Sequence, residues 1–251
     1  MPLYSPAANL LAARTILITG AGDGIGRAAA LSFAAHGASV ILLGRTAAKL
    51  EKVYDEIERR GFKRPAILSI DLALAAPAQF DQASQTIGQE FGVLDGLLHN
   101  AAETGTLTPV ELYRPYMWQR VLQVNLYAAW MLTRACLPLM RKSADASIVF
   151  TTSDAGRKGR AYWGAYGVSG FALEGLMQTV ADEIAVEGRI RANSLNPGAV
   201  RTALRARLYP GEDPQTLPTP EAIMPAYLFL LGPDSRGLNG QRFNAGDYMQ
   251  K

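Results

Sequence analysis

The stretch Thr15–His36, TILITGAGDGIGRAAALSFAAH, decides the fold class of this chain. Its first five residues form a short apolar run that is typical of a buried strand. A glycine-rich turn over residues 20–26 follows, and a helix is expected from Ile25 to about His36. Strand, tight turn and helix in this order make the first half of a βαβ unit.

The rest of the chain repeats this alternation of short apolar runs and longer helical patterns. Further strands are expected at residues 39–43, 66–70, 94–98, 147–151, 190–195 and 241–244. Helices are expected at residues 47–60, 77–91 and 165–186, and a long helical region, interrupted before Trp118, runs to about Met140. The pattern predicts one α/β domain over residues 1–251, with a Rossmann-like, doubly wound and mostly parallel sheet flanked by helices.

Tyr209–Pro220, YPGEDPQTLPTP, breaks this alternation because it has four prolines in twelve residues. Such a segment cannot form a continuous helix or a central strand, so a loop is expected. It follows the sixth strand, where sheets of this class place their ligand crevice. The segment is either a surface connection or part of a substrate lid over about residues 202–220.

The turn TGAGDGIG, residues 19–26, is suited to binding a nucleotide. Gly20, Gly24 and Gly26 let the backbone turn sharply and come close to a ligand. The helix that begins there offers unpaired N–H groups and the positive end of its dipole to a pyrophosphate. Asp23 and Ile25 lie in the same turn and are expected to contact the cofactor. The alternative is a plain connecting turn.

The overall composition argues against several other classes of protein. The net charge is only +3 and the basic residues are scattered, so no nucleic-acid partner is expected. Cys136 is the only cysteine, which excludes an intramolecular disulfide and fits a cytoplasmic location. His36 and His99 are far apart in the chain, so no metal site is expected. No run approaches the roughly 20 apolar residues of a membrane span, so no membrane partner is expected.

Several separate motifs resemble the short-chain dehydrogenase/reductase family, in the order in which that family carries them. They span nearly the whole chain and are the turn at residues 19–26, Asp71–Leu72, the segment Leu98–Ala102, Asn125, Ser153 with Tyr166 thirteen residues later, Asn196–Gly198 and Thr202. The segment LHNAA departs from the family's N-N-A-G pattern at His99 and Ala102. Residues 156–166 and 201–220 further resemble a little-characterised bacterial subgroup, the YciK-like oxidoreductases.

The resemblance assigns cofactor contacts to several of these motifs. The expected contacts beyond the glycine turn are Asp71 and Leu72 on the adenine side, Asn100, and Pro197, Gly198 and Thr202 beside the nicotinamide. The residue after Gly44 bears on which dinucleotide binds, because an arginine there can accommodate a 2′-phosphate. Position 44 carries no carboxylate, and Arg45 offers a charge-assisted fork, so NADP(H) is expected over NAD(H). The alternative for Arg45 is a solvated side chain near a helix start.

The resemblance also implies the catalytic residues. Ser153 would orient a carbonyl, Tyr166 would donate the proton, and Asn125 would be the family's structural and catalytic asparagine. The family's lysine, four residues after the tyrosine, is replaced by Gly170. That lysine would lower the tyrosine pKa and bind the nicotinamide ribose, and glycine can do neither. A natural loss of activity, a natural substitute and a deliberate change of the site all remain open, and Gly170→Lys is expected to raise kcat strongly if the rest of the site is intact.

The leading hypothesis is therefore an NADP(H)-dependent oxidoreductase, acting on a small carbonyl or alcohol substrate whose identity the sequence does not name. The alternative is a catalytically silent NADP(H)-binding module with a role in sensing or assembly. The family resemblance also implies a homodimer or homotetramer, packed through the helices that hold Asn125 and Tyr166.

Overall fold

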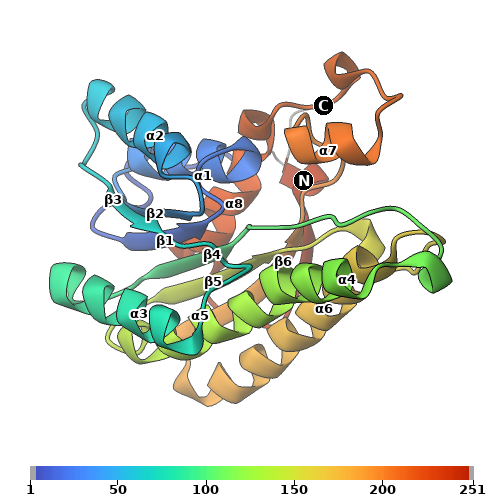
Figure 1. Ribbon diagram of the computed structural model, residues 1–251. Helices are drawn as coiled ribbons and strands as arrows, with labels where there is room; N and C mark the ends of the chain where they lie inside the picture. The colour runs from blue at the N-terminus through green and yellow to red at the C-terminus, as the bar shows by residue number, and fades with distance from the viewer. Residues whose placement is uncertain (1–3, 249–251) are drawn as a thin grey trace.

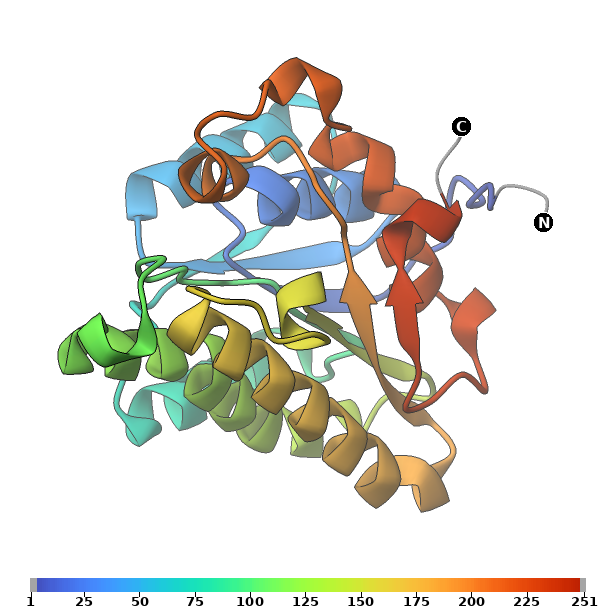
Figure 2. The same ribbon diagram turned by 90° about the vertical axis from the view of Figure 1, so that its right-hand side faces the viewer.

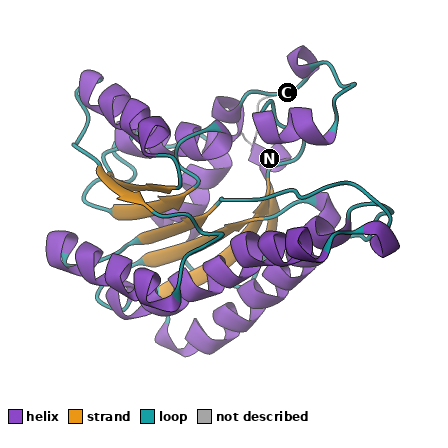
Figure 3. Ribbon diagram, viewed as in Figure 1, coloured by secondary structure: helices purple, strands orange, loops and turns teal. Residues whose placement is uncertain are grey.

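The computed structural model describes residues 4–248 and contains a single seven-stranded sheet (Figures 1 and 3). The strands are β1 Thr15–Thr19, β2 Ser39–Gly44, β3 Ala66–Ser69, β4 Gly96–His99, β5 Ala146–Thr151, β6 Ile190–Asn196 and β7 Arg242–Asn244. Their spatial order is β3-β2-β1-β4-β5-β6-β7, and every neighbouring pair is parallel. The order reverses between β1 and β4, which makes the sheet doubly wound and confirms the predicted fold class.

Helices cover both faces of the sheet, as the two views of the ribbon show (Figures 1 and 2). The helices are α1 Gly24–Ala35, α2 Ala47–Arg59, α3 Pro77–Phe91, α4 Pro115–Leu122, α5 Ala128–Met140, α6 Gly164–Ile184, α7 Ala203–Leu208 and α8 Met224–Leu231. Helices α1, α2 and α8 lie on one face, and α3, α4, α5 and α6 on the other. A parallel sheet buried on both faces is built from strands that are largely apolar, and all five residues of β1, TILIT, are buried.

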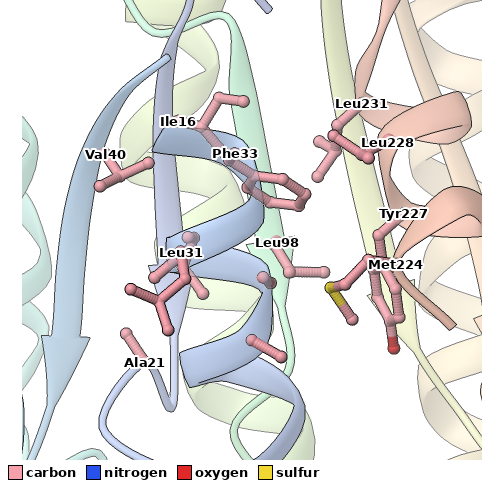
Figure 4. Close-up of a cluster of buried hydrophobic side chains, with 14 of the residues drawn as sticks. Ile16, Ala21, Leu31, Phe33, Val40, Leu98, Met224, Tyr227, Leu228 and Leu231 are labelled. Atoms are coloured by element: carbon pink, nitrogen blue, oxygen red, sulfur yellow. The ribbon is translucent and has the colours of Figure 1, made fainter. Parts of the chain in front are cut away.

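The core on the α1 side joins the two ends of the chain (Figure 4). Phe33 of α1 packs among strand residues such as Ile16 and Leu98, together with Leu228 and Leu231 of α8. Helix α8 is apolar on all sides, MPAYLFLL, and most of it is buried. A helix of this kind lacks the amphipathic period that identifies a surface helix, which is why the sequence did not predict it.

The long helical region before Met140 is two helices joined by a π-helical segment, Gln123–Tyr127. The interruption predicted before Trp118 is the irregular stretch that ends where Pro115 opens α4. Short π segments inside helices are frequent at functional sites, and this one contains the buried Asn125. Between residues 4 and 248, no helix is both long enough and apolar enough to span a membrane.

Candidate active site

A cleft of about 570 Å³ opens at the carboxyl ends of the strands, across the point where the strand order reverses. The predicted site residues that line it are Gly20, Asp23, Gly24, Ile25, Arg45, Asp71, Leu72, Asn100, Ser153, Tyr166, Pro197 and Thr202. Four others, Gly26, Asn125, Gly170 and Gly198, are not part of its wall. Residues from the ends of six strands or from the segments just after them therefore meet in one place, as parallel strands require.

The glycine turn after β1 forms the floor of the cleft. Gly20 and Gly24 have left-handed φ angles of +69° and +50°, which favour glycine. A Cβ on Gly26 would overlap the carbonyl group of Gly20, so that glycine permits the close packing of α1 against the end of β1. Asp23 caps α1 by accepting a hydrogen bond of 2.8 Å from the Gly24 N–H.

The ends of β1 and β4 are tied together beside this turn. The Thr19 Oγ1 accepts hydrogen bonds from the backbone N–H groups of Asn100 at 2.9 Å and Ala101 at 3.0 Å. The Asn100 side chain donates back to the Thr19 carbonyl at 3.3 Å. Asn100 therefore lies in the cleft in an orientation fixed by β1.

At the end of the cleft next to β2, Lys49 lies close to Asp23 and Arg45 lies close to Glu103. Lys49 donates to Asp23 at 2.6 Å, and this hydrogen bond holds the pKa of Asp23 below its usual value. Arg45 is 59% exposed, and its Nη1 lies 4.0 Å from the Glu103 Oε2. Asp71 turns its carboxylate toward its own loop, where it accepts from the Ala73 N–H at 3.0 Å.

At the other end, Ser153 follows β5 and Tyr166 lies in the first turn of α6. Burial raises the pKa of Tyr166 above its usual value of 10, the hydrogen bond with Ser153 opposes this shift, and the nearby Tyr209 adds to it. Trp163 packs against the Tyr166 ring, 5.7 Å away between centroids, and against the Tyr209 ring, 5.9 Å away, with both ring pairs tilted. Trp163 and Tyr209 therefore form an aromatic cluster with the Tyr166 ring.

Gly170 lies one turn along α6 and packs against the backbone of the segment that carries Ser153. A Cβ built on Gly170 would lie 2.7 Å from the Gly156 Cα and 3.2 Å from the Gly156 nitrogen. Real side chains do not approach a backbone this closely. A side chain at position 170 would therefore require the backbone around Gly156 to shift. The rise in kcat expected for Gly170→Lys stays a prediction, and it depends on that shift.

Asn125 contributes to the site by holding other parts of it in place. Its Oδ1 accepts from the Glu103 N–H at 2.7 Å, and its Nδ2 donates to the Glu103 carbonyl at 3.0 Å. The same Nδ2 donates to the Ser169 Oγ at 2.9 Å, and that hydroxyl donates to the Tyr166 carbonyl at 2.8 Å. The amide therefore links the loop after β4 to the helix of Tyr166.

Two further side chains anchor the turn that carries Ser153. The carboxylate of Glu174, which is 3% exposed, accepts from Thr152 at 2.9 Å, from Arg157 at 3.1 Å and from Ser194 at 2.7 Å. Asn196 donates to Asp154 at 2.7 Å and accepts from the Gly198 N–H at 3.0 Å. Gly198 and Pro197 are thereby fixed relative to Ser153.

The segment 202–220 begins with a capped helix and is held together by arginines. Thr202 caps α7 and its methyl group lies against Gly24. Arg205 pairs with Glu212 at 2.6 Å and stacks on Tyr209, with its guanidinium carbon 3.6 Å from the ring centroid. Arg201 donates to three carbonyl groups of residues 214–217. The expected loop is present at Tyr209–Pro220, and α7 was not predicted.

Comparison with known proteins decides the family. The model of the short chain dehydrogenase family matches residues 14–213. The chain belongs to this family. A curated relative, the uncharacterized oxidoreductase YciK of Escherichia coli K12, is 49% identical over 96% of this chain and 95% of its own length. The expected family and the resemblance to the YciK-like subgroup are both confirmed.

Solved structures of relatives have the same fold. A structure from Pseudomonas syringae, assigned to the short chain dehydrogenases, is 55% identical, covers 96% of this chain and 98% of its own, and has a TM-score of 0.95. A short chain dehydrogenase structure from Escherichia coli CFT073, complexed with NADPH, is 49% identical, covers 96% and 99% of the two chains, and has a TM-score of 0.93.

His99, one of the departures from the family pattern, is a core residue of this dehydrogenase. It is buried, stacks on Phe150 with 4.8 Å between centroids, and its Nε2 lies 2.9 Å from the Thr133 hydroxyl. Burial lowers the pKa of His99 to about 3, so the ring is neutral near pH 7. It is not part of the cleft wall, so no catalytic role is assigned to it.

Several residues that shape the site were not named as site residues from the sequence. Lys49, Glu103 and Glu174 were missed, and Thr19 and Tyr209 were included only as members of the predicted turn and of the predicted lid. Glu174 offered a signal, since a glutamate stands there among apolar residues of a helix, FALEGLM. The others contact residues that are distant in the sequence, and no local sequence pattern predicts such contacts.

Proposed function

We propose that this chain is an NADP(H)-dependent oxidoreductase that transfers hydride between the nicotinamide and a carbonyl or alcohol substrate. The observation that carries the proposal is the single cleft that has the glycine turn, Arg45 and the Ser153–Tyr166 pair in its wall. The NADPH complex of the relative from Escherichia coli CFT073 supports the choice of cofactor.

The residues of this chain fit such a cofactor. The floor of the cleft is bare backbone at Gly20 and Gly24, and a side chain at either would be strained or would crowd its neighbours. The start of α1 points N–H groups at this floor, where a pyrophosphate would be stabilised. Arg45 would hold the 2′-phosphate, and Pro197 and Thr202 would lie beside the nicotinamide, which supplies or accepts the hydride when bound.

Ser153 and Tyr166 would act on the substrate oxygen. The Ser153 hydroxyl would donate a hydrogen bond to the carbonyl, and the Tyr166 phenol would give it a proton as negative charge develops. Burial raises the pKa of the Tyr166 phenol above its usual value of 10. The phenol therefore stays protonated at neutral pH, which suits reduction of a carbonyl and opposes oxidation of an alcohol.

A comparison of pH–rate profiles in the two directions tests this role. Because oxidation needs the phenolate, which at an unperturbed pKa would be only about 0.1% of the tyrosine at pH 7, its kcat should rise about tenfold per pH unit from pH 7 to 9. Reduction should stay nearly constant over that range, since the raised pKa keeps the phenol protonated. An oxidation rate independent of pH would contradict the assignment, and Tyr166→Phe should lose about 10²- to 10⁴-fold in either direction.

A catalytically silent NADP(H)-binding module is the second candidate, and the absence of lysine at position 170 favours it. A fluorescence titration with NADPH and NADH, followed by turnover assays on a panel of ketones and aldehydes, separates the two. Micromolar NADPH binding with turnover that Tyr166→Phe abolishes supports the enzyme. The same binding without turnover of any substrate supports the silent module, and failure to bind either dinucleotide contradicts both.

A further inference from the structure

Glu103 places a negative charge at the end of the cleft where the 2′-phosphate of the cofactor is proposed to bind. Its carboxylate is 17% exposed and lines the same cleft as Arg45. The Glu103 Oε2 lies 4.0 Å from the Arg45 Nη1 and 3.6 Å from the Arg120 Nε. Arg45 itself is 59% exposed, so its guanidinium can move between partners.

The backbone of Glu103 is fixed, which keeps this charge in place. Asn125 binds both the N–H and the carbonyl of Glu103, at 2.7 and 3.0 Å. Those bonds do not involve the Glu103 side chain. A substitution of that side chain therefore removes the charge without removing the link from this loop to Ser169 and α6.

We propose that Glu103 weakens the preference for NADP(H) by competing with the 2′-phosphate for Arg45. The inference rests on the phosphate-binding role proposed for Arg45. A guanidinium binds either a carboxylate or a phosphate, and the more highly charged phosphate is the stronger partner. NADP(H) must displace Glu103 from Arg45 and bear its repulsion, whereas NAD(H) has no group that competes. Glu103 thus lowers the preference for NADP(H) below what Arg45 alone would give.

The test is the nearly isosteric variant Glu103→Gln, measured by equilibrium titration. An exposed ion pair contributes little free energy in water. NADPH should therefore bind about two- to fivefold more tightly to the variant, and the affinity for NADH should be unchanged. Adenosine 2′,5′-bisphosphate and 5′-AMP, which lack the nicotinamide, should show the same contrast and are independent of Gly170. The gain should shrink as salt rises, because salt screens exposed charges.

Glu187→Gln is the matched control. Glu187 is also 17% exposed and pairs with an exposed arginine, Arg141, at 2.9 Å, but it is not part of the cleft wall. This variant should leave all four dissociation constants unchanged. The proposal is overturned if Glu103→Gln raises the affinity for NADH and NADPH equally, or if it raises neither.

Arg45→Met distinguishes failure of this inference from failure of the proposed function. Loss of the preference for NADPH in Arg45→Met, together with no effect of Glu103→Gln, overturns only the role of Glu103. An unchanged preference in Arg45→Met overturns the phosphate site and the competition together. In the Arg45→Met background, the expected gain from Glu103→Gln becomes smaller, because the contested cation is absent.

Discussion

The helix propensity of glycine does not explain why Gly170 lies within α6, but its packing against Gly156 does. Glycine within a helix costs about 1 kcal/mol relative to alanine, so Gly170→Ala should stabilise the protein if only the helix mattered. The added Cβ would instead lie 2.7 Å from the Gly156 Cα, and overpacking of this kind costs about 1–3 kcal/mol. We therefore expect Gly170→Ala to lower the free energy of unfolding, as measured by urea denaturation.

Gly175 provides the matched control in the same helix. It is exposed, and a Cβ there would meet nothing within 4 Å. Gly175→Ala should therefore raise stability by about 0.5–1 kcal/mol. If both variants gained stability, the close contact between Gly156 and Gly170 would be shown not to constrain the site. Gly170→Lys carries the same crowded Cβ, so a lysine there is expected to bring a loss of stability along with any gain in rate.

At the scale of the elements, the turn between β5 and α6 is anchored by one buried carboxylate. Glu174 lies beneath this turn, accepting hydrogen bonds from Thr152, Arg157 and Ser194. Removing one partner from a buried, paired set costs about 3–5 kcal/mol, because the remaining charges lose their compensation. Glu174→Ala should lose about that much stability in urea denaturation.

Glu174→Gln separates a role in positioning from one in stability. The amide keeps the shape and part of the hydrogen bonding, so the variant should fold and bind NADPH. If Glu174 positions Ser153, kcat for carbonyl reduction should fall about tenfold or more while KM changes little. A normal kcat in a well-folded Glu174→Gln would restrict its role to stability.

The elements also show what the sequence can and cannot predict. β1 and α3 have the bounds that were predicted, because both carry strong local signals. Helix α8 and the π segment at residues 123–127 were missed, the first because it lacks a polar face and the second because it differs from a helix only in its hydrogen bonds. The gathering of Ser153, Tyr166 and the glycine turn followed from motif order and parallel strands. The contact of Gly156 with Gly170 did not, since it depends on how a turn and a helix pack.

At the scale of the whole molecule, an ion cluster at the amino ends of the strands lies opposite the cleft. Asp145 precedes β5 and pairs with Arg14 at 2.7 Å, with Arg191 and with Arg236 at 3.4 Å, so it ties the start of the chain to its last third. Burial alone would raise the pKa of Asp145, but the charges of Arg191 and Arg14 and their hydrogen bonds lower it overall. Stability from Asp145 is therefore full above its usual pKa near 3.8 and is lost as pH falls through the lower, folded value.

Asp145→Asn tests this cluster. At pH 7 the variant should lose about 3–5 kcal/mol of unfolding free energy, and the difference from the wild type should shrink below about pH 4. NADPH binding should be unchanged at pH 7, because the cluster is not part of the cleft wall. A stability difference that stayed constant down to pH 2 would show that the ionised carboxylate is not what stabilises the fold.

The outer surface of the layer formed by α4, α5 and α6 is a candidate interface between copies of this chain. Large apolar side chains are exposed there, among them Trp130 at 44%, Val168 at 47% and Phe171 at 48%. Such exposure costs free energy in water, and burial against a second copy would recover it, so we expect a homodimer or homotetramer that packs through this layer. Light scattering after gel filtration should give a multiple of the 27.0 kDa chain mass for the wild type and a shift toward the monomer for Phe171→Glu. Val186→Glu, at a residue 93% exposed just beyond the end of α6, is the control and should leave the mass unchanged. A wild-type protein that stays monomeric at tens of micromolar would show that these side chains serve another purpose.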